Sequence, residues 1–174
     1  MANWNLDTAH SEIEFKVRHM MISTVKGQFR DFQVNLSSES EDIAQSTIEA
    51  SIDAASIDTK SEQRDQHLKS GDFFDIETYP KISFRSTSIE KVSSENYRIT
   101  GELTIKDVTK PVTFDAELGG VAKDPWGNAK VGYTIAGKIN REDFGLTWNA
   151  ALETGGVMVS DEVKFSADIQ FVKS

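Results

Sequence analysis

Apolar and polar residues alternate one by one over most of this chain, and this alternation restricts its fold more than any other feature. Residues 11–19 read SEIEFKVRH, which places Ile13, Phe15 and Val17 on one face and charged residues on the other. A period of two is the pattern of a half-buried β-strand, because successive side chains of a strand point to opposite faces. The pattern predicts an all-β protein. It returns in residues 47–54, 81–89, 97–105, 112–118, 131–139 and 163–171.

A further strand, over residues 25–36, is irregular, because its apolar positions change face between Phe29 and Phe32. A β-bulge near Arg30–Asp31 would return the later side chains to the inner face. About eight amphipathic antiparallel strands predict one barrel domain over residues 1–174, since closure removes exposed strand edges.

The inward faces of these strands mix large aromatic residues with small ones such as Gly101, Ala116 and Gly137. Small inward residues leave room for a ligand, but they also help large side chains to interdigitate in a tapering barrel. Eight strands enclose an interior that side chains fill or that holds one ligand. The strand pattern alone leaves both outcomes open.

Composition narrows the classes of partner. The chain of 174 residues has a formal net charge of −9, and a field of that sign repels the phosphates of nucleic acid. The absence of cysteine excludes disulfides, thiolate zinc sites and thiol nucleophiles. There is no apolar run of about 18 residues, and the first residues lack the basic and apolar regions of a signal peptide. We therefore expect a cytoplasmic protein that binds no nucleic acid and is not integral to a membrane.

The stretch RDQHLKSGDFFD, residues 64–75, interrupts the alternation. Thr59 and Glu62 match the capping box that starts a helix, and a glycine follows at the position just after the helix end. The helix itself is almost entirely polar. We expect it to pack mainly through Phe73, Phe74 and Ile76, as a cap over one end of the barrel.

Few residues are arranged for catalysis or for metal binding. None of the three histidines is paired at the spacing of helical zinc ligands, and the G-x-S-x-G turn of hydrolases is absent. The densest polar cluster contains Arg64, Asp65 and His67. We interpret it as structural, with charged hydrogen bonds that orient the cap. A metal site or an acid–base group is the alternative.

Two other positions carry polar groups of interest. His19 shares the inner face of its strand with Phe15 and Val17, so it is either a hydrogen-bonded core histidine or a contact to the head group of a ligand. Near residue 140 the alternation stops again, and Arg141 with Asp143 predicts a charge-stabilised turn or short helix. A catalytic acid in that turn is the minority interpretation.

Seven segments together carry motifs specific enough to name a family: DTAHSEIEFKVRHM (7–20), VKGQFRDF (25–32), SIDTKSEQRDQHLKSGDFFD (56–75), YPKISFRST (79–87), GELTIKDVTKPV (101–112), INREDFGLTWN (139–149) and DEVKF (161–165). Through these segments the chain resembles the YceI-like proteins, a lipocalin-like group that binds polyisoprenoids. The resemblance implies an extended antiparallel, eight-stranded lipocalin-like barrel with one or two short capping helices, whose apolar interior holds a long isoprenoid or similar chain. It implies no catalytic activity, and we expect no cofactor.

We therefore expect a soluble lipid-binding protein that transports, stores or senses a prenyl lipid, a quinone or a similar apolar chain, and a homodimer is compatible with this role. One alternative is an enzyme that acts on an isoprenoid or quinone. The other is a filled barrel that mediates protein contacts. The residues expected to contact the ligand are Phe15, Val17, His19, Phe29, Phe73, Phe74, Phe84, Leu103, Phe114, Tyr133 and Phe165.

Overall fold

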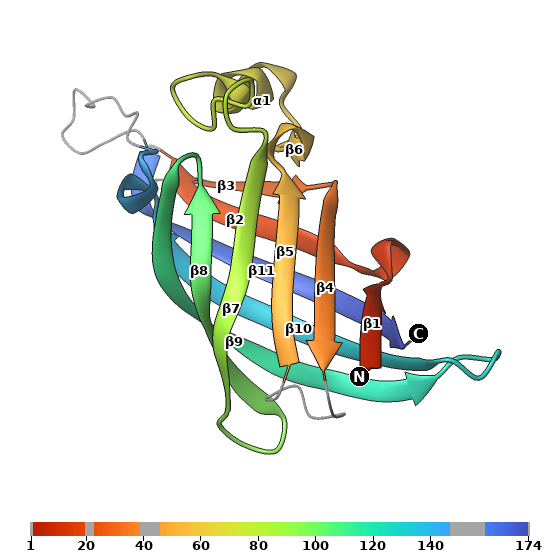
Figure 1. Cartoon of the computed structure of the whole chain (residues 1–174). Helices are drawn as coiled ribbons and strands as arrows, with labels where there is room; N and C mark the ends of the chain where they lie inside the picture. Colours follow the sequence, from red (N-terminus) through yellow and green to blue (C-terminus); the bar gives the residue numbers. More distant parts are fainter. Residues whose placement is uncertain (1, 20–22, 39–45, 147–158, 174) are drawn as a thin grey trace.

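The computed structural model describes residues 2–19, 23–38, 46–146 and 159–173, and most of these residues lie in one β-sheet (Figure 1). No helix in this part of the chain is long and apolar enough to cross a membrane. The strands are β1 (Ala2–Leu6), β2 (Glu12–His19), β3 (Ser23–Phe29), β4 (Phe32–Ser38), β5 (Ser46–Asp53), β6 (Ile57–Asp58), β7 (Lys81–Lys91), β8 (Asn96–Ile105), β9 (Val108–Lys123), β10 (Ala129–Asn140) and β11 (Val159–Lys173). The helix is α1 (Glu62–Lys69), and the short 3-10 turns are η1 (Thr8–His10), η3 (Ala54–Ser56) and η4 (Arg141–Phe144).

The sheet closes into an antiparallel barrel. Its hydrogen-bonded order is β1-β4-β5-β7-β8-β9-β10-β11, and β11 pairs with β1 to complete the ring. β2 pairs with the same edge of β11, further along that strand than β1. β3 then pairs with β2, and β6 pairs with β3. In Figure 1 the strands β4, β5, β7 and β8 run across β2, β10 and β11, which lie behind them. The predicted all-β, eight-stranded barrel is therefore confirmed.

Three of the barrel strands are interrupted. β1 is separated from β2 by η1, β3 from β4 by Arg30–Asp31, and β5 from β6 by η3. Backbone hydrogen bonds link two of these breaks, from Arg30 N to Ser56 O at 3.2 Å and from Asp53 N to Asp31 O at 2.9 Å. The prediction of a single bulge near Arg30–Asp31 is wrong, because the strand stops there and its neighbour breaks with it. β6 then pairs with β3 whereas β5 pairs with β7, so the sheet splits at this end.

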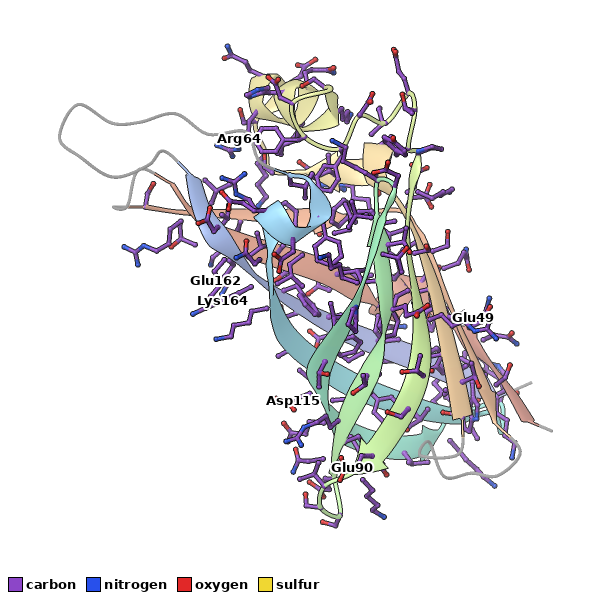
Figure 2. All side chains as sticks on the ribbon, turned by 60° about the vertical axis from the view of Figure 1, so that its left-hand side comes forward. Glu49, Arg64, Glu90, Asp115, Glu162 and Lys164 are labelled. Atoms are coloured by element: carbon purple, nitrogen blue, oxygen red, sulfur yellow. The ribbon has the colours of Figure 1, made fainter. Side chains whose placement is uncertain are left out.

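The outer face of the barrel is polar, as the alternation predicts. The outward positions of β5, β7 and β9 are mostly exposed, those of β11 are exposed or half-buried, and the inward positions are mostly buried or half-buried. Figure 2 shows charged side chains that project away from the barrel wall: Glu49, Glu90, Asp115, Glu162 and Lys164.

The helix α1 lies over the split end of the barrel (Figure 1). Ser61 is its N-cap, and the Ser61 hydroxyl accepts a hydrogen bond from Arg64 N at 3.4 Å. The capping box predicted Thr59 for this role, two residues too early. Thr59 is instead buried, with 4% of its surface exposed. Its hydroxyl donates to Asp65 Oδ1 at 2.5 Å and accepts from Arg64 Nε at 2.8 Å.

Thr59→Val should test this anchor, because valine keeps the shape of threonine and removes the hydroxyl. We expect the free energy of unfolding to fall by about 1 kcal/mol, since two charged side chains lose a partly buried hydrogen-bond partner. A urea denaturation curve measures the change. Thr78→Val, at an exposed turn position of the same segment, is the control and should unfold like wild type. Equal stability of the two variants would show that the hydroxyl does not hold the cap.

Two clusters of buried apolar side chains lie toward the two ends of the barrel. The cluster beneath α1 contains Phe29, Ala54, Ile57, Phe73, Ile82, Ile105, Phe144 and Leu146. The cluster toward the opposite end contains Trp4, Phe32, Val34, Leu36, Ile48, Phe84, Ile89, Tyr97, Ile99, Ala116, Val131, Tyr133, Ala167, Ile169 and Phe171.

Candidate functional site

A cavity of about 360 Å³ lies inside the barrel. Its lining begins with Leu68 of α1 and with Phe73, which follows the helix, and reaches Ile169 and Phe171 near the C-terminal end of β11. The cavity therefore extends along most of the barrel. Its volume falls in the ordinary range of small-molecule sites, which is roughly 300–1,000 Å³.

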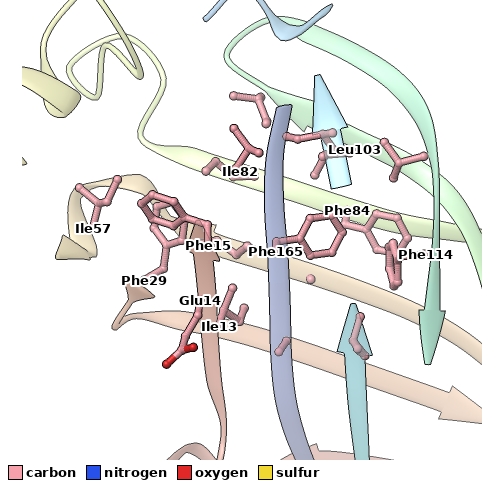
Figure 3. A pocket seen from close by; sticks show the side chains of 18 of the residues that line it. Ile13, Glu14, Phe15, Phe29, Ile57, Ile82, Phe84, Leu103, Phe114 and Phe165 are labelled. Atoms are coloured by element: carbon pink, nitrogen blue, oxygen red, sulfur yellow. The ribbon is translucent and has the colours of Figure 1, made fainter. Parts of the chain in front are cut away.

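The lining is almost entirely hydrocarbon. It consists of Ala, Val, Leu, Ile and Phe side chains, with five residues of other types: Glu14, Arg64, His67, Tyr133 and Arg141. Figure 3 shows that the Glu14 carboxylate points away from the neighbouring phenylalanine rings. Such a surface offers few hydrogen bonds to water, and it favours an apolar occupant.

Phenylalanine rings form two groups along this wall (Figure 3). Beneath α1, the ring centroids of Phe15 and Phe29 are 5.6 Å apart, and those of Phe29 and Phe74 are 6.0 Å apart. Deeper in the barrel, the ring of Phe114 on β9 packs against two others. Its centroid lies 5.0 Å from that of Phe84 on β7 and 5.6 Å from that of Phe165 on β11. Contacts of this length are normal for tilted or edge-to-face aromatic pairs.

Ten of the eleven residues expected to contact a ligand line this cavity: Phe15, Val17, Phe29, Phe73, Phe74, Phe84, Leu103, Phe114, Tyr133 and Phe165. That they contact a ligand stays a prediction. The eleventh, His19, is the last residue of β2, and its side chain lies outside the described part of the chain. The choice between a core histidine and a head-group contact therefore stays open.

The polar cluster of α1 holds the cap in place. Arg64 Nη2 donates to Thr59 O at 2.7 Å, and Asp65 Oδ1 accepts from Thr59 N at 2.9 Å. His67 Nε2 lies 2.8 Å from Asp72 Oδ2, and its ring packs edge-on against Phe73. The expected anchoring role of Arg64 and Asp65 is confirmed. In the part of the chain that the structure describes, no three His, Asp or Glu side chains gather in a way that could hold a metal ion.

Arg141 is a buried cation that lines the cavity from η4, with only 3% of its surface exposed. Its Nη1 donates to Leu146 O at 2.5 Å, which closes the turn, and its Nη2 lies 4.0 Å from Asp161 Oδ1. Burial lowers the pKa of Arg141, and the nearby charges of Asp161 and Glu142 oppose this shift. Sequence reasoning missed Arg141 as a lining residue. The signal was present, because Arg141 takes the next inward position after Ile139 in the period-two pattern.

Known proteins share this architecture over nearly its whole length. The family model of the YceI-like domain matches residues 4–171. A UPF0312 protein from Staphylococcus aureus strain N315 is 45% identical over 172 residues, which cover 98% of this chain and 98% of that protein. The crystal structure of the Campylobacter jejuni YceI protein is 34% identical, with a TM-score of 0.78 over 97% of this chain and 96% of its own.

A polyisoprenoid binding domain from Saccharophagus degradans, implicated in plant cell wall breakdown, has the same fold, with a TM-score of 0.75 over 98% of each chain and 14% identity. At that identity the likeness concerns the fold alone. The family match and the closer relatives extend further, and together they show that the chain belongs to the YceI-like family.

Proposed function

We propose that this protein binds the chain of a long polyisoprenoid, either a prenyl lipid or a quinone, or of a similar apolar molecule, inside its barrel. The observation that carries the proposal is the apolar cavity of about 360 Å³ that extends from α1 to Phe171. A flexible hydrocarbon chain matches both the extent and the chemistry of this lining. The fold shared with a polyisoprenoid binding domain supports the same class of occupant.

Burial of the ligand's hydrocarbon chain supplies the binding affinity. Each buried CH₂ group contributes about 0.8 kcal/mol, so the carbons of one isoprene unit contribute about 4 kcal/mol together. Association costs on the order of 4–15 kcal/mol in lost freedom of motion. Several isoprene units therefore bind without many polar contacts, whereas a single unit does not. Discrimination between kinds of apolar chain is loose, and the cavity limits the length that is held.

Three of the five polar residues of the lining lie at one end of the cavity, and they give the bound ligand a direction. Arg64 and His67 belong to α1, and Arg141 contributes from η4, which packs in the cluster beneath α1 through Phe144. The opposite end is surrounded by a mostly apolar cluster of buried side chains, which includes Tyr97 and Tyr133 with ring centroids 6.4 Å apart. The polar head of the ligand lies beneath α1, and its tail extends toward Phe171.

The proposed role is binding for transport, storage or sensing, not catalysis. Nucleophilic and acid–base catalysis need a nucleophile or a titrating group aimed at the substrate. The described lining contains no Ser, Thr, Cys, Asp or Lys, and its one carboxylate, Glu14, points away from the neighbouring rings (Figure 3). His67 is held by Asp72 and packs against Phe73.

Freshly purified protein should carry a long-chain lipid. Native mass spectrometry under gentle conditions should show a protein–lipid complex, and an organic extract should contain the same molecule. Delipidated protein should rebind geranylgeraniol, a prenyl alcohol of four isoprene units, and return it chemically unchanged. Conversion of the alcohol to a product would favour the enzyme alternative. Protein that carries no lipid and rebinds no geranylgeraniol would contradict the proposal.

A further inference from the structure

Phenylalanine rings in the cavity wall lie in hollows left by glycines. A Cβ atom added to each of these glycines would lie within 2.7 Å of a carbon of the neighbouring ring, which is closer than real Cβ atoms come to other atoms. Each ring therefore occupies space that any other residue would fill with its own side chain. The three pairs are Gly27 with Phe15, Gly101 with Phe84, and Gly137 with Phe165.

The strand register explains two of these pairs. Gly27 of β3 is directly opposite Phe15 of β2, and Gly137 of β10 is directly opposite Phe165 of β11. Side chains directly opposite each other on antiparallel strands have Cβ atoms only about 4.5–5.5 Å apart. A ring can lie flat across the neighbouring strand only where that strand carries no side chain. Glycine at the opposite position allows the ring to rest against the barrel wall.

We propose that Gly27, Gly101 and Gly137 keep the cavity open to a chain by holding these rings against the wall. This inference rests on the proposed function. A ring displaced from its hollow enters the cavity, because that is the unoccupied space on the inner side of the sheet. The glycines decide the free width of the cavity without offering a side chain to the ligand.

The destabilising effect of glycine in a strand supports a functional role for these three glycines. Glycine within a strand makes a protein less stable than alanine would, by roughly 0.5–1 kcal/mol. An inward glycine therefore lowers stability without a gain unless a neighbouring side chain occupies the space that it leaves. The chain also contains glycines without such a role. A Cβ atom added to Gly71 or Gly120 would meet no atom within 4 Å.

Gly27→Ala is the sharpest test of the proposal. A Cβ atom added to Gly27 meets only side chains, the ring of Phe15 and Cγ2 of Thr59 at 2.9 Å, whereas at the other two glycines it also meets a backbone oxygen or a Cβ atom of the next strand. We expect Gly27→Ala to bind geranylgeraniol about tenfold more weakly than wild type, the loss for two excluded CH₂ groups. Adding Phe15→Leu should restore most of the affinity, because the smaller side chain vacates the space.

Two controls separate the effect of the displaced Phe15 ring from other causes of weaker binding. Gly120→Ala makes the same change on an exposed strand position and should bind geranylgeraniol like wild type. Gly27→Ala combined with Thr59→Ser removes the second contact, keeps the hydroxyl that anchors the cap, and should not restore binding. Restoration by Thr59→Ser in place of Phe15→Leu would overturn the proposal, and so would wild-type affinity in Gly27→Ala.

A readout without ligand distinguishes this inference from the proposed function. Gly27→Ala and Phe15→Leu should each lower the melting temperature of the delipidated protein, and the double variant should melt above Gly27→Ala alone. If wild type binds geranylgeraniol but the double variant loses the sum of the two single decreases in melting temperature, the ring of Phe15 and the glycine do not interact and the inference is overturned. Wild type that binds no geranylgeraniol contradicts the proposed function itself, whatever the melting temperatures show.

Discussion

Leu103→Arg should leave the purified protein without lipid. Leu103 lies in β8 opposite Phe84 of β7, and both side chains line the cavity. A guanidinium at this position blocks the passage of a chain, and it costs several kcal/mol wherever it stays unpaired among apolar side chains. The cations Arg64 and Arg141 at the same lining offer no compensating charge. Native mass spectrometry and analysis of the organic extract, side by side with wild type, measure the loss.

Leu103→Trp is the milder companion variant, because it keeps the wall apolar and narrows the cavity. We expect this variant to fold and to carry less lipid or shorter chains. Glu102→Gln changes the adjacent, exposed side chain on the outer face, and the lipid load should stay at the wild-type level. Circular dichroism confirms that each variant is folded. If both inward variants fold and keep the full load, Leu103 does not border the path of the chain.

The barrel could be predicted from the sequence because its signal is local. Each strand carries its own inward and outward faces, and ten of the residues expected on the inward face or at the cap do line the cavity. The breaks could not be predicted in the same way. The interruption at Arg30–Asp31 is matched by hydrogen bonds to Asp53 and Ser56, which lie more than twenty residues away in the chain. A local pattern does not record such partners.

The start of α1 shows how tertiary contacts override a local motif. Thr59 and Glu62 have the spacing of a capping box, yet Ser61 caps the helix. Lys60 has a left-handed backbone, with φ of 63°, and so turns the chain between Thr59 and the helix. The Thr59 hydroxyl is already engaged by Asp65 and Arg64. Burial of Thr59 therefore decides its role, and burial is not visible in a four-residue pattern.

The small inward residues illustrate a limit of a different kind. Their presence was compatible with empty space for a ligand and with interdigitation of large side chains. The structure contains both, because the ring of Phe165 fills the hollow at Gly137 while a cavity remains beside it. Which small residue receives which ring depends on strand register, since Gly137 and Phe165 are direct partners. Register between strands follows from the assembled sheet and not from either strand alone.

Arg141→Met should lower the free energy of unfolding by about 3 kcal/mol, because it leaves the buried carbonyl of Leu146 without its charged donor and removes the partner of Asp161. Methionine retains the length and apolar stem of the side chain, so the loss reports the guanidinium and not a new void. Part of the loss is offset, since a buried cation no longer has to be desolvated. Urea denaturation of the delipidated protein measures the effect, and Arg98→Met, at an exposed position of β8, should change stability little. Equal stability of the two variants would mean that the free-energy cost of desolvating Arg141 equals the stabilisation from its hydrogen bond and ion pair. The apolar packing of Phe144 would then hold the turn Arg141–Leu146 instead.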